Sequence, residues 1–447
     1  MDHPDSLSEA SPSALLAERR RRALERLGDG AALLLPAAPE LRVGLDTEVR
    51  YRPDAELYYL TGCTEPEAVA LLDPTSDEGP FVVFVRPRDP EAELWSGPRE
   101  GPERARARLG ADAAFELDEL PGHLGELMGR VDTLYYRLGG GRVDMDARVI
   151  AQLAATRKAR QRAGVGVRAL VDPGAILDDL RIVKSPEELE RVRRACAVTA
   201  AAFADAARVV RPGAGEWEVE AALEAGFRRR GAWGPAFPTI VASGANATVL
   251  HYSANDRRLR EGELVLLDGG AYTGLYAGDI SRTFPVSGHF SPLQRRIYEI
   301  VLAAHARAIA AVRPAATEAD VHQAAARVLV EGALELGVLR GDPEELLADR
   351  ERYRSVFPHR TSHWLGIEVH DVGDYARAGE PRRLEAGMVL TVEPGLYLRA
   401  DAEEVPAELR GLGIRIEDDV AVTADGAEVL TAELPADPEG VERLTGG

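Results

Sequence analysis

The stretch EGELVLLDGGAYTGLYAGDISRTFPV, residues 261–286, predicts a β-hairpin around which the rest of the fold is arranged. Its first arm contains the apolar run 264–267, which is typical of a buried strand. Residues 272–274 supply the expected turn, and residues 280–286 form the second arm.

Two acidic residues, Asp268 and Asp279, lie on opposite arms of this hairpin. A buried strand rarely carries an unpaired carboxylate, because burying a bare charge is costly. Two carboxylates that face each other would also repel, and a divalent cation between them would remove both costs. The alternative is that the acids lie at solvated strand ends, since Asp-Gly is also a common turn sequence.

A second segment repeats the pattern of the first arm. Residues 383–393, RLEAGMVLTVE, follow the same order as residues 258–268, RLREGELVLLD. In both copies a glycine opens an apolar strand, and a carboxylate closes the strand at the same distance from that glycine. Asp268 and Glu393 are therefore predicted to occupy equivalent positions in two halves of a pseudo-symmetric unit.

Two further segments carry polar groups. A strand predicted over residues 413–422, GIRIEDDVAV, places Arg415 and Glu417 on one face by its period-two alternation. Residues 359–373, HRTSHWLGIEVHDVG, hold three of the nine histidines. A lone histidine is more often a surface or core residue, but this density indicates a site. One imidazole and four carboxylates suit manganese or cobalt better than a structural zinc.

The motifs LLDGGAYTGLYAGDISRTFPV, HRTSHWLGIEVHDVG, LTVEPGLYL and GIRIEDDV together resemble the metallopeptidase family with the pita-bread fold. The closest resemblance within it is to aminopeptidase P, the Xaa-Pro aminopeptidases. Residues 47–72 also resemble the N-terminal domain signature of that group. The resemblance implies an α/β N-terminal domain, residues 1–175, and an α+β pita-bread catalytic domain with pseudo-two-fold symmetry, residues 176–447.

The resemblance implies two divalent metal ions, with manganese as the expected metal and cobalt or zinc as alternatives. The ions would bridge a water molecule and lower its pKa, which supplies hydroxide at neutral pH. Glu393 would be both a metal ligand and the group that transfers the proton of this water. The implied metal ligands are Asp268, Asp279, His363, Glu393 and Glu417.

The resemblance also implies residues that contact the substrate. Among them, His251 and His370 would assist catalysis by steadying the developing oxyanion and the leaving residue. One position departs from the family, which usually has glycine after the first histidine of the histidine-rich motif, where this chain has Arg360. The implied substrate-binding residues are His251, His359, His370, Tyr397 and Arg415.

The implied activity is release of the N-terminal residue from peptides with proline in the second position. Xaa-Pro dipeptidase (prolidase) has the same fold and ligands and is the enzymatic alternative, although the motif SHWLGIEVHDVG favours the aminopeptidase. Creatinase-like hydrolases use the fold without metal, and non-catalytic pita-bread binding proteins lose ligands. This chain keeps the whole implied ligand set, which argues against both.

The amino-acid composition restricts the expected binding partners and cellular compartment. The formal charge of −20, from 54 basic and 74 acidic residues, disfavours nucleic acid and anionic membranes as partners. Cys63 and Cys196 are too few for a disulfide framework and fit a reducing, cytoplasmic environment. We see no signal peptide and no apolar run of about 18 residues that would span a membrane. A homodimer or homotetramer is expected from the family resemblance alone.

Local patterns complete the sequence-based prediction. Residues 31–172 alternate short apolar runs with helical patterns, which indicates an α/β layer domain. The segment Ser-Pro-Glu-Glu at 185–188 predicts a capped helix start. Residues 341–352 are expected to form an exposed acidic insert, and the stretch after 432 shows no strong pattern.

Overall fold

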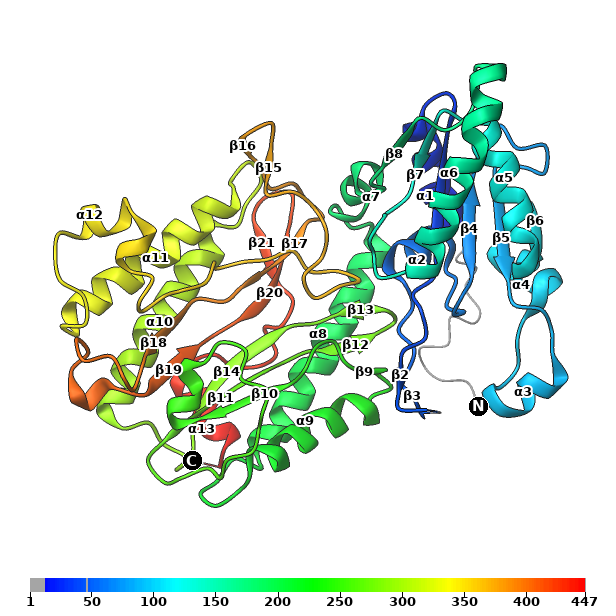
Figure 1. Cartoon of the computed structure of the whole chain (residues 1–447). Coiled ribbons are helices and arrows are strands. Elements are labelled where there is room, and N and C mark those ends of the chain that lie inside the picture. Colours follow the sequence, from blue (N-terminus) through cyan, green and yellow to red (C-terminus); the bar gives the residue numbers. More distant parts are fainter. Residues whose placement is uncertain (1–12, 46, 447) are drawn as a thin grey trace. The chain divides into compact units, whose positions relative to one another are not determined.

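The computed structural model describes residues 13–45 and 47–446. The chain divides into two compact units, and the N-terminal unit ends at Arg181 where the C-terminal unit begins at Ile182 (Figure 1). The sequence analysis predicted this change at residue 175. In the structure, helix α7 (Gly174–Arg181) still belongs to the N-terminal unit. Each unit has its own hydrophobic core.

The N-terminal unit is built on a mixed six-stranded sheet with the strand order β6-β5-β4-β1-β7-β8. Strand β1 pairs antiparallel with β4 and parallel with β7. Leu124 and Leu127 of helix α5 pack with Phe84 of β5 in one buried cluster, as expected for an α/β layer domain. The strands are β1 (Ala31–Pro36), β2 (Arg42–Val43), β3 (Thr47–Glu48), β4 (Val69–Leu72), β5 (Phe81–Val85), β6 (Ala113–Glu116), β7 (Thr133–Tyr135) and β8 (Ala169–Val171). The other helices are α1 (Ser13–Leu27), α2 (Ala55–Thr61), α3 (Pro90–Ser96), α4 (Gly101–Leu109), α5 (Leu120–Arg130) and α6 (Val143–Ala163).

The C-terminal unit contains two similar halves, each with a pair of packed helices followed by a small antiparallel sheet (Figure 1). The first half has the sheet order β10-β11-β14, and the second has β17-β20-β21. The first-half elements are α8 (Pro186–Ala207), α9 (Glu216–Arg229), β10 (Ile240–Ser243), β11 (Leu264–Gly269) and β14 (Ile280–Pro285). The second-half elements are α10 (Pro292–Ala311), α11 (Glu318–Glu335), β17 (Val389–Val392), β20 (Asp418–Val422) and β21 (Ala427–Val429).

The predicted pseudo-two-fold symmetry is visible at the start of the two central strands. Gly262 and Gly387, which precede β11 and β17, both have positive φ angles of 79° and 94°. The side chain of Arg258 donates to the carbonyl of Gly213 at 2.8 Å, and Arg383 donates to Ala315 at the same distance. The sequence repeat is therefore also a structural repeat.

The predicted hairpin is present, but its turn lies one residue later than expected. Strand β11 pairs with β14, so that Asp268 lies opposite Ser281. The tip is formed by the short strands β12 (Ala271–Thr273) and β13 (Tyr276–Ala277). Gly274 and Leu275 have φ angles of 57° and 63°, which is the left-handed geometry of a two-residue hairpin turn.

The strand predicted over residues 413–422 is divided into two. Strand β19 (Leu412–Arg415) pairs with β18 (Gly395–Leu398), whereas β20 pairs with β17. Glu417 lies at the interruption, because the chain changes its pairing partner there. The period-two pattern could not reveal this change of sheet, and residues 413–422 are all buried rather than divided into a buried and an exposed face.

Two segments without a predicted structure contain short helices. Helix α12 (Pro343–Leu347) buries Leu346 and Leu347, so the acidic stretch is not a fully exposed insert. Helix α13 (Pro438–Leu444) buries Val441 after the cap residue Asp437. The predicted cap of α8 is confirmed by reciprocal hydrogen bonds between Ser185 and Glu188. The remaining strands are β9 (Gly234–Pro235), β15 (Ala376–Arg377) and β16 (Glu380–Pro381). Among the described helices, none has the length and apolar character needed to cross a membrane.

Candidate active site

A cavity of about 940 Å³ in the C-terminal unit is lined by residues from both halves. It brings together every residue that the sequence implied as a metal ligand. It also places His251, His359, His370 and Arg415 around the same space. Tyr397 is not among the lining residues. It lies behind His359 and Arg415 and contacts both. The acidic lining residues are Asp268, Asp279, Glu318, Asp371, Glu393 and Glu417.

The elements position the acidic groups mainly at strand ends. Asp268 is inside β11, Asp279 directly precedes β14, and Glu393 directly follows β17. Glu417 lies between β19 and β20, and His363 lies on the segment between α11 and β17. The sequence predicted that the groups would converge from separate strands, whereas four of the five lie beside strands rather than within them.

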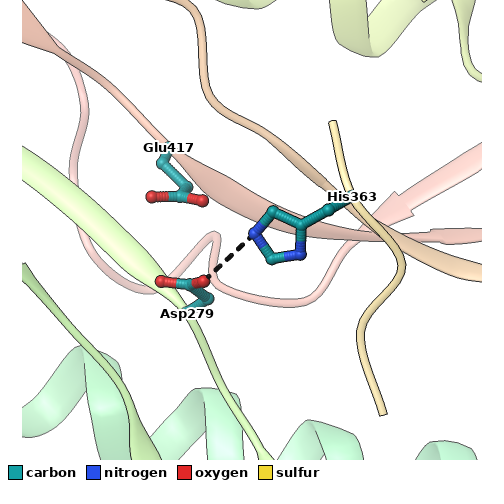
Figure 2. A group of neighbouring side chains, drawn as sticks. All are labelled: Asp279, His363 and Glu417. Atoms are coloured by element: carbon teal, nitrogen blue, oxygen red, sulfur yellow. Dashed lines mark ion pairs between the residues drawn. The ribbon is translucent and has the colours of Figure 1, made fainter. Parts of the chain in front are cut away.

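Asp279, His363 and Glu417 form the tightest part of the cluster (Figure 2). One possible ligand atom from each lies within 4.8 Å of the others. The His363 Nε2 atom is 3.4 Å from Asp279 Oδ2 and 3.7 Å from Glu393 Oε1. Its Nδ1 atom donates to the carbonyl of Trp364 at 3.1 Å, so the Nε2 atom on the other side of the ring faces the carboxylates.

The protein offsets the negative charge of these carboxylates only in part. Among the described residues, Oδ1 of Asp268 and Oδ1 of Asp279 are buried without a hydrogen-bond partner. Burial, and then the neighbouring carboxylates, raise the pKa of Asp279 and of Glu417 well above the ordinary values. Hard divalent cations prefer oxygen ligands supplemented by a neutral imidazole. The donor set and its unpartnered oxygens therefore fit such cations.

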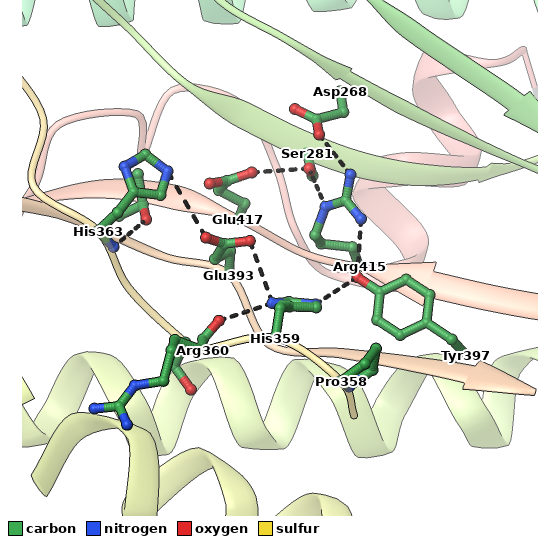
Figure 3. Close-up of polar contacts among 12 residues, drawn as sticks. Asp268, Ser281, Pro358, His359, Arg360, His363, Glu393, Tyr397, Arg415 and Glu417 are labelled. Carbon is green, nitrogen blue, oxygen red and sulfur yellow. Dashed lines mark hydrogen bonds and ion pairs between the residues drawn. The ribbon is translucent and has the colours of Figure 1, made fainter. Parts of the chain in front are cut away.

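Arg415 links several groups at one side of the cluster (Figure 3). Its Nη2 donates to Asp268 Oδ2 at 2.5 Å, its Nε to Ser281 Oγ at 2.7 Å, and its Nη1 to the Tyr397 hydroxyl at 2.8 Å. The Ser281 hydroxyl in turn donates to Glu417 Oε2 at 2.8 Å. Ser281 was missed by sequence reasoning, although its place opposite Asp268 in the predicted hairpin was a usable signal.

His359 is held in one tautomer by its two partners. Its Nδ1 donates to the Arg360 carbonyl at 2.7 Å, because a carbonyl can only accept. Burial, and then the charge of Arg415, lower the pKa of His359 to about 3. The ring is therefore neutral, and its Nε2 accepts from the Tyr397 hydroxyl at 2.7 Å. The Nδ1 edge lies 3.5 Å from Glu393 Oε2.

His370 and His251 lie on two loops at the cavity. The ring of His370 packs edge-on against His363 with centroids 4.3 Å apart. Burial, followed by the charges of His363 and His251, lowers the pKa of His370. The loop of His251 is anchored by the buried Glu216, which accepts from the Tyr252 hydroxyl at 2.8 Å. Glu216 was not identified from the sequence.

Asp419 supports the cluster from behind. Its Oδ2 accepts from the backbone N–H of Asp279 at 2.8 Å and from the Cys196 thiol at 3.1 Å. Burial raises the pKa of Cys196 well above its ordinary value, so the thiol stays protonated. The prediction that Cys196 is a core residue is confirmed by its complete burial.

His322 of α11 holds the segment between His359 and His363. Its Nδ1 contacts the Thr361 hydroxyl at 2.8 Å, and its Nε2 contacts the Tyr353 hydroxyl at 3.1 Å. Burial, and then the charges of Arg360 and Arg350, lower the pKa of His322 to about 4. An isolated histidine in a helix gave no sequence signal for this role.

The low pKa of His322 predicts acid sensitivity of the C-terminal unit. The unfolded chain takes up this proton near pH 6.5, whereas the folded protein resists protonation until about pH 4. The stabilisation is therefore complete above pH 6.5 and is lost as the pH falls toward 4. We expect His322 to account for about 2 kcal/mol of the stability lost between pH 7 and pH 5. Urea unfolding of His322→Gln at both pH values should show a smaller difference than the wild type. Replacement of the exposed His289 should leave the difference unchanged, and equal differences in all three proteins would contradict this assignment.

Comparisons with known proteins identify the family and the fold of the chain. The model of metallopeptidase family M24 matches residues 190–424, and the model of the aminopeptidase P N-terminal domain matches residues 16–135. The chain is 42% identical over 429 residues to the Xaa-Pro aminopeptidase of Escherichia coli (strain K12), with 96% of each chain covered. The structure of Pseudomonas aeruginosa aminopeptidase PepP superposes with a TM-score of 0.93 at 42% identity, covering 97% of this chain and 98% of that one. Zinc-substituted E. coli aminopeptidase P in complex with product gives a TM-score of 0.92 at 41% identity, covering 98% and 99%.

The chain belongs to metallopeptidase family M24, with the α+β pita-bread catalytic domain of that family. The match to the aminopeptidase P N-terminal domain, together with likeness over nearly the full length, confirms the predicted resemblance to aminopeptidase P. The protein is therefore a metallopeptidase, as the intact set of acidic and histidine residues predicted.

Proposed function

We propose that the protein is an Xaa-Pro aminopeptidase that hydrolyses the bond before a proline in the second position of a peptide. The observation that carries this proposal is the convergence of four carboxylates and one imidazole in a single cavity, with two buried carboxylate oxygens unpartnered among the described residues. Such a site can hold cations that bind a free α-amino group, as an aminopeptidase requires. The names of the similar proteins support proline specificity.

The cluster would hold two divalent cations, with manganese as the proposed metal and cobalt or zinc as alternatives. When bound, these ions would supply the Lewis acidity that makes water a nucleophile at neutral pH and would polarise the scissile carbonyl. His363 would contribute the free lone pair of its Nε2 atom. The proposed ligands are Asp268, Asp279, His363, Glu393 and Glu417.

Glu393 is the proposed proton carrier. Its Oε1 faces His363 and its Oε2 faces His359, so the carboxylate lies between the metal cluster and the histidine that borders the far part of the cavity. From that position it would accept a proton from the attacking water and return it to the leaving nitrogen. His370 and His251 would donate to the developing oxyanion and steady the leaving residue.

His359, with Tyr397 and Arg415 behind it, would form the wall against the proline ring. The nitrogen of proline carries no hydrogen in the peptide bond, so recognition cannot depend on an N–H donor at that position. A fixed, neutral imidazole offers a rigid surface for the ring without requiring that donor. The hydrogen bonds from Arg415 to Tyr397 and from Tyr397 to His359 supply this rigidity.

The decisive test compares substrates on the metal-free enzyme reloaded separately with manganese, cobalt or zinc. We expect Arg-Pro-Pro to be cleaved, Arg-Ala-Pro to be cleaved far more slowly, and N-acetylated Arg-Pro-Pro to resist cleavage because its amine is blocked. Equal rates for proline and alanine in the second position would leave only a general metalloaminopeptidase. Rapid cleavage of Xaa-Pro dipeptides without cleavage of tripeptides would instead identify a prolidase.

We also propose that the protein acts in the cytoplasm as a homodimer or homotetramer. The support for the location is that Cys63 and Cys196 are both free and buried, which suits a reducing compartment. The oligomeric state rests on the family resemblance. Light scattering that detects only monomer at micromolar concentration would contradict it.

A further inference from the structure

Arg360 is a half-exposed cation at the cavity that has no part in the function proposed above. It lines the same cavity as Glu393 and His359, and its side chain remains 50% exposed. Its Nε and Nη2 atoms donate to the two carboxylate oxygens of Glu318. Its Nη1 atom has no hydrogen-bond partner within the described part of the chain. By contrast, Arg415 is buried, and each of its three guanidinium nitrogens is engaged.

Glu318 fixes the orientation of this guanidinium. It is the first residue of helix α11, directly after the cap residue Thr317, and it is only 5% exposed. A paired contact between an arginine fork and a carboxylate restrains the guanidinium plane as well as its position. Because both oxygens of Glu318 are occupied, the remaining N–H groups of Arg360 form a preorganised donor edge, and a partner that binds there orders few additional side chains.

Arg360 lies next to His359, on the side of the cavity toward which a bound peptide would continue. Arg360 follows His359 directly, and its carbonyl accepts the hydrogen bond that fixes the His359 ring. Its side chain is directed away from Glu393 and His363 (Figure 3). A peptide whose amine lies at the carboxylates and whose proline lies against His359 continues away from the cluster by about 3.3–3.6 Å per residue. An arginine side chain spans the distance of one or two such residues.

We propose that Arg360 binds a carboxylate of the substrate one or two residues after the proline. The ligand is either the free C-terminus of a tripeptide or tetrapeptide, or an aspartate or glutamate side chain at that place in a longer peptide. This inference rests on the proposed aminopeptidase function, which supplies the direction of the peptide. It assigns a substrate preference to the residue at which the histidine-rich motif departs from the family.

The test uses the metal-loaded enzyme with Ala-Pro-Ala as the free acid and as its C-terminal amide. We expect the wild type to favour the acid in kcat/KM by roughly threefold to tenfold, the range for a charge-assisted contact at a partly exposed site. Arg360→Gln should bring this ratio to about one by raising KM for the acid alone. Arg360→Lys keeps the charge but loses the fork, and it should give an intermediate ratio.

Arg399→Gln is the matched control, because Arg399 is exposed, paired with Asp401 and absent from the cavity lining. This variant should keep the wild-type preference for the acid. A wild-type ratio near one would overturn the proposal. The same holds if Arg360→Gln slows acid and amide alike, since the residue would then act on the fold. If the enzyme cleaves Ala-Ala-Ala but neither proline peptide, the proposed function itself is wrong.

Discussion

Replacement of Glu393 by glutamine should reduce turnover by at least 10²-fold to 10⁴-fold, the range for loss of a positioned general acid–base group. Glutamine keeps the size and shape of the side chain but cannot accept a proton from water. The carboxylate lies between His363 and His359 at distances of 3.7 and 3.5 Å, and no other carboxylate of the described residues forms an ion pair with both histidines. The effect should appear in kcat rather than in KM, because proton transfer belongs to the chemical step.

The metal content of the Glu393→Gln variant shows whether turnover is lost because proton transfer fails or because metal is lost. Elemental analysis should be performed on the same preparation as the kinetic assay, after loading with excess manganese. Glu385→Gln is a suitable control, since Glu385 is exposed in the same segment of the chain. A Glu393→Gln protein that retains bound metal and more than about a tenth of wild-type activity would exclude Glu393 as the proton carrier.

The two-fold repeat of the catalytic unit could be predicted because each copy of the repeat is a short, continuous sequence pattern. The glycine, apolar run and carboxylate of each half are adjacent in the chain, so Asp268 and Glu393 could be matched without a structure. The capping residues of α8 were equally local. The helices α12 and α13 were missed because each is short, and periodicity needs more residues to become visible.

The supporting residues could not be predicted because they act through long-range contacts. Ser281 matters because it lies between Arg415 and Glu417, and Asp419 matters because it accepts from the backbone of Asp279. Neither residue type by itself indicates which distant group it contacts. The division of residues 413–422 into β19 and β20 likewise depends on which strands are available for pairing. These features follow from tertiary structure rather than from local sequence.

Arg282 shows how much stability such contacts can carry. It is fully buried in β14, and its guanidinium donates to Asp418 Oδ1 at 2.8 Å. It also donates to four backbone carbonyls, and these join β14 to the start of β20 and to the C-terminal segment. Those carbonyls belong to Ser281, Glu417, Leu434 and Pro435. Burial alone would raise the pKa of Asp418, but Arg282 and His305 outweigh it and lower that pKa to about 2.

Arg282→Met should therefore destabilise the C-terminal unit by about 3–5 kcal/mol, the cost of breaking one side of a buried ion pair. Methionine fills much of the volume but removes the guanidinium donors of Asp418 and of the four carbonyls. Asp418 then keeps the Thr431 hydroxyl, and the Ser281 carbonyl keeps the N–H of Glu417. Urea unfolding followed by tryptophan fluorescence, to which the buried Trp364 contributes, should show the lower midpoint. Arg296→Met removes an exposed arginine that lies 4.0 Å from Glu335 and should leave the midpoint unchanged. The double variant Arg282→Met/Asp418→Leu also removes the stranded carboxylate and should recover part of the loss. If the single variant unfolds at the wild-type midpoint, Arg282 does not hold these segments together. If the double variant recovers nothing, the unbonded carbonyls and not the buried charge account for the cost.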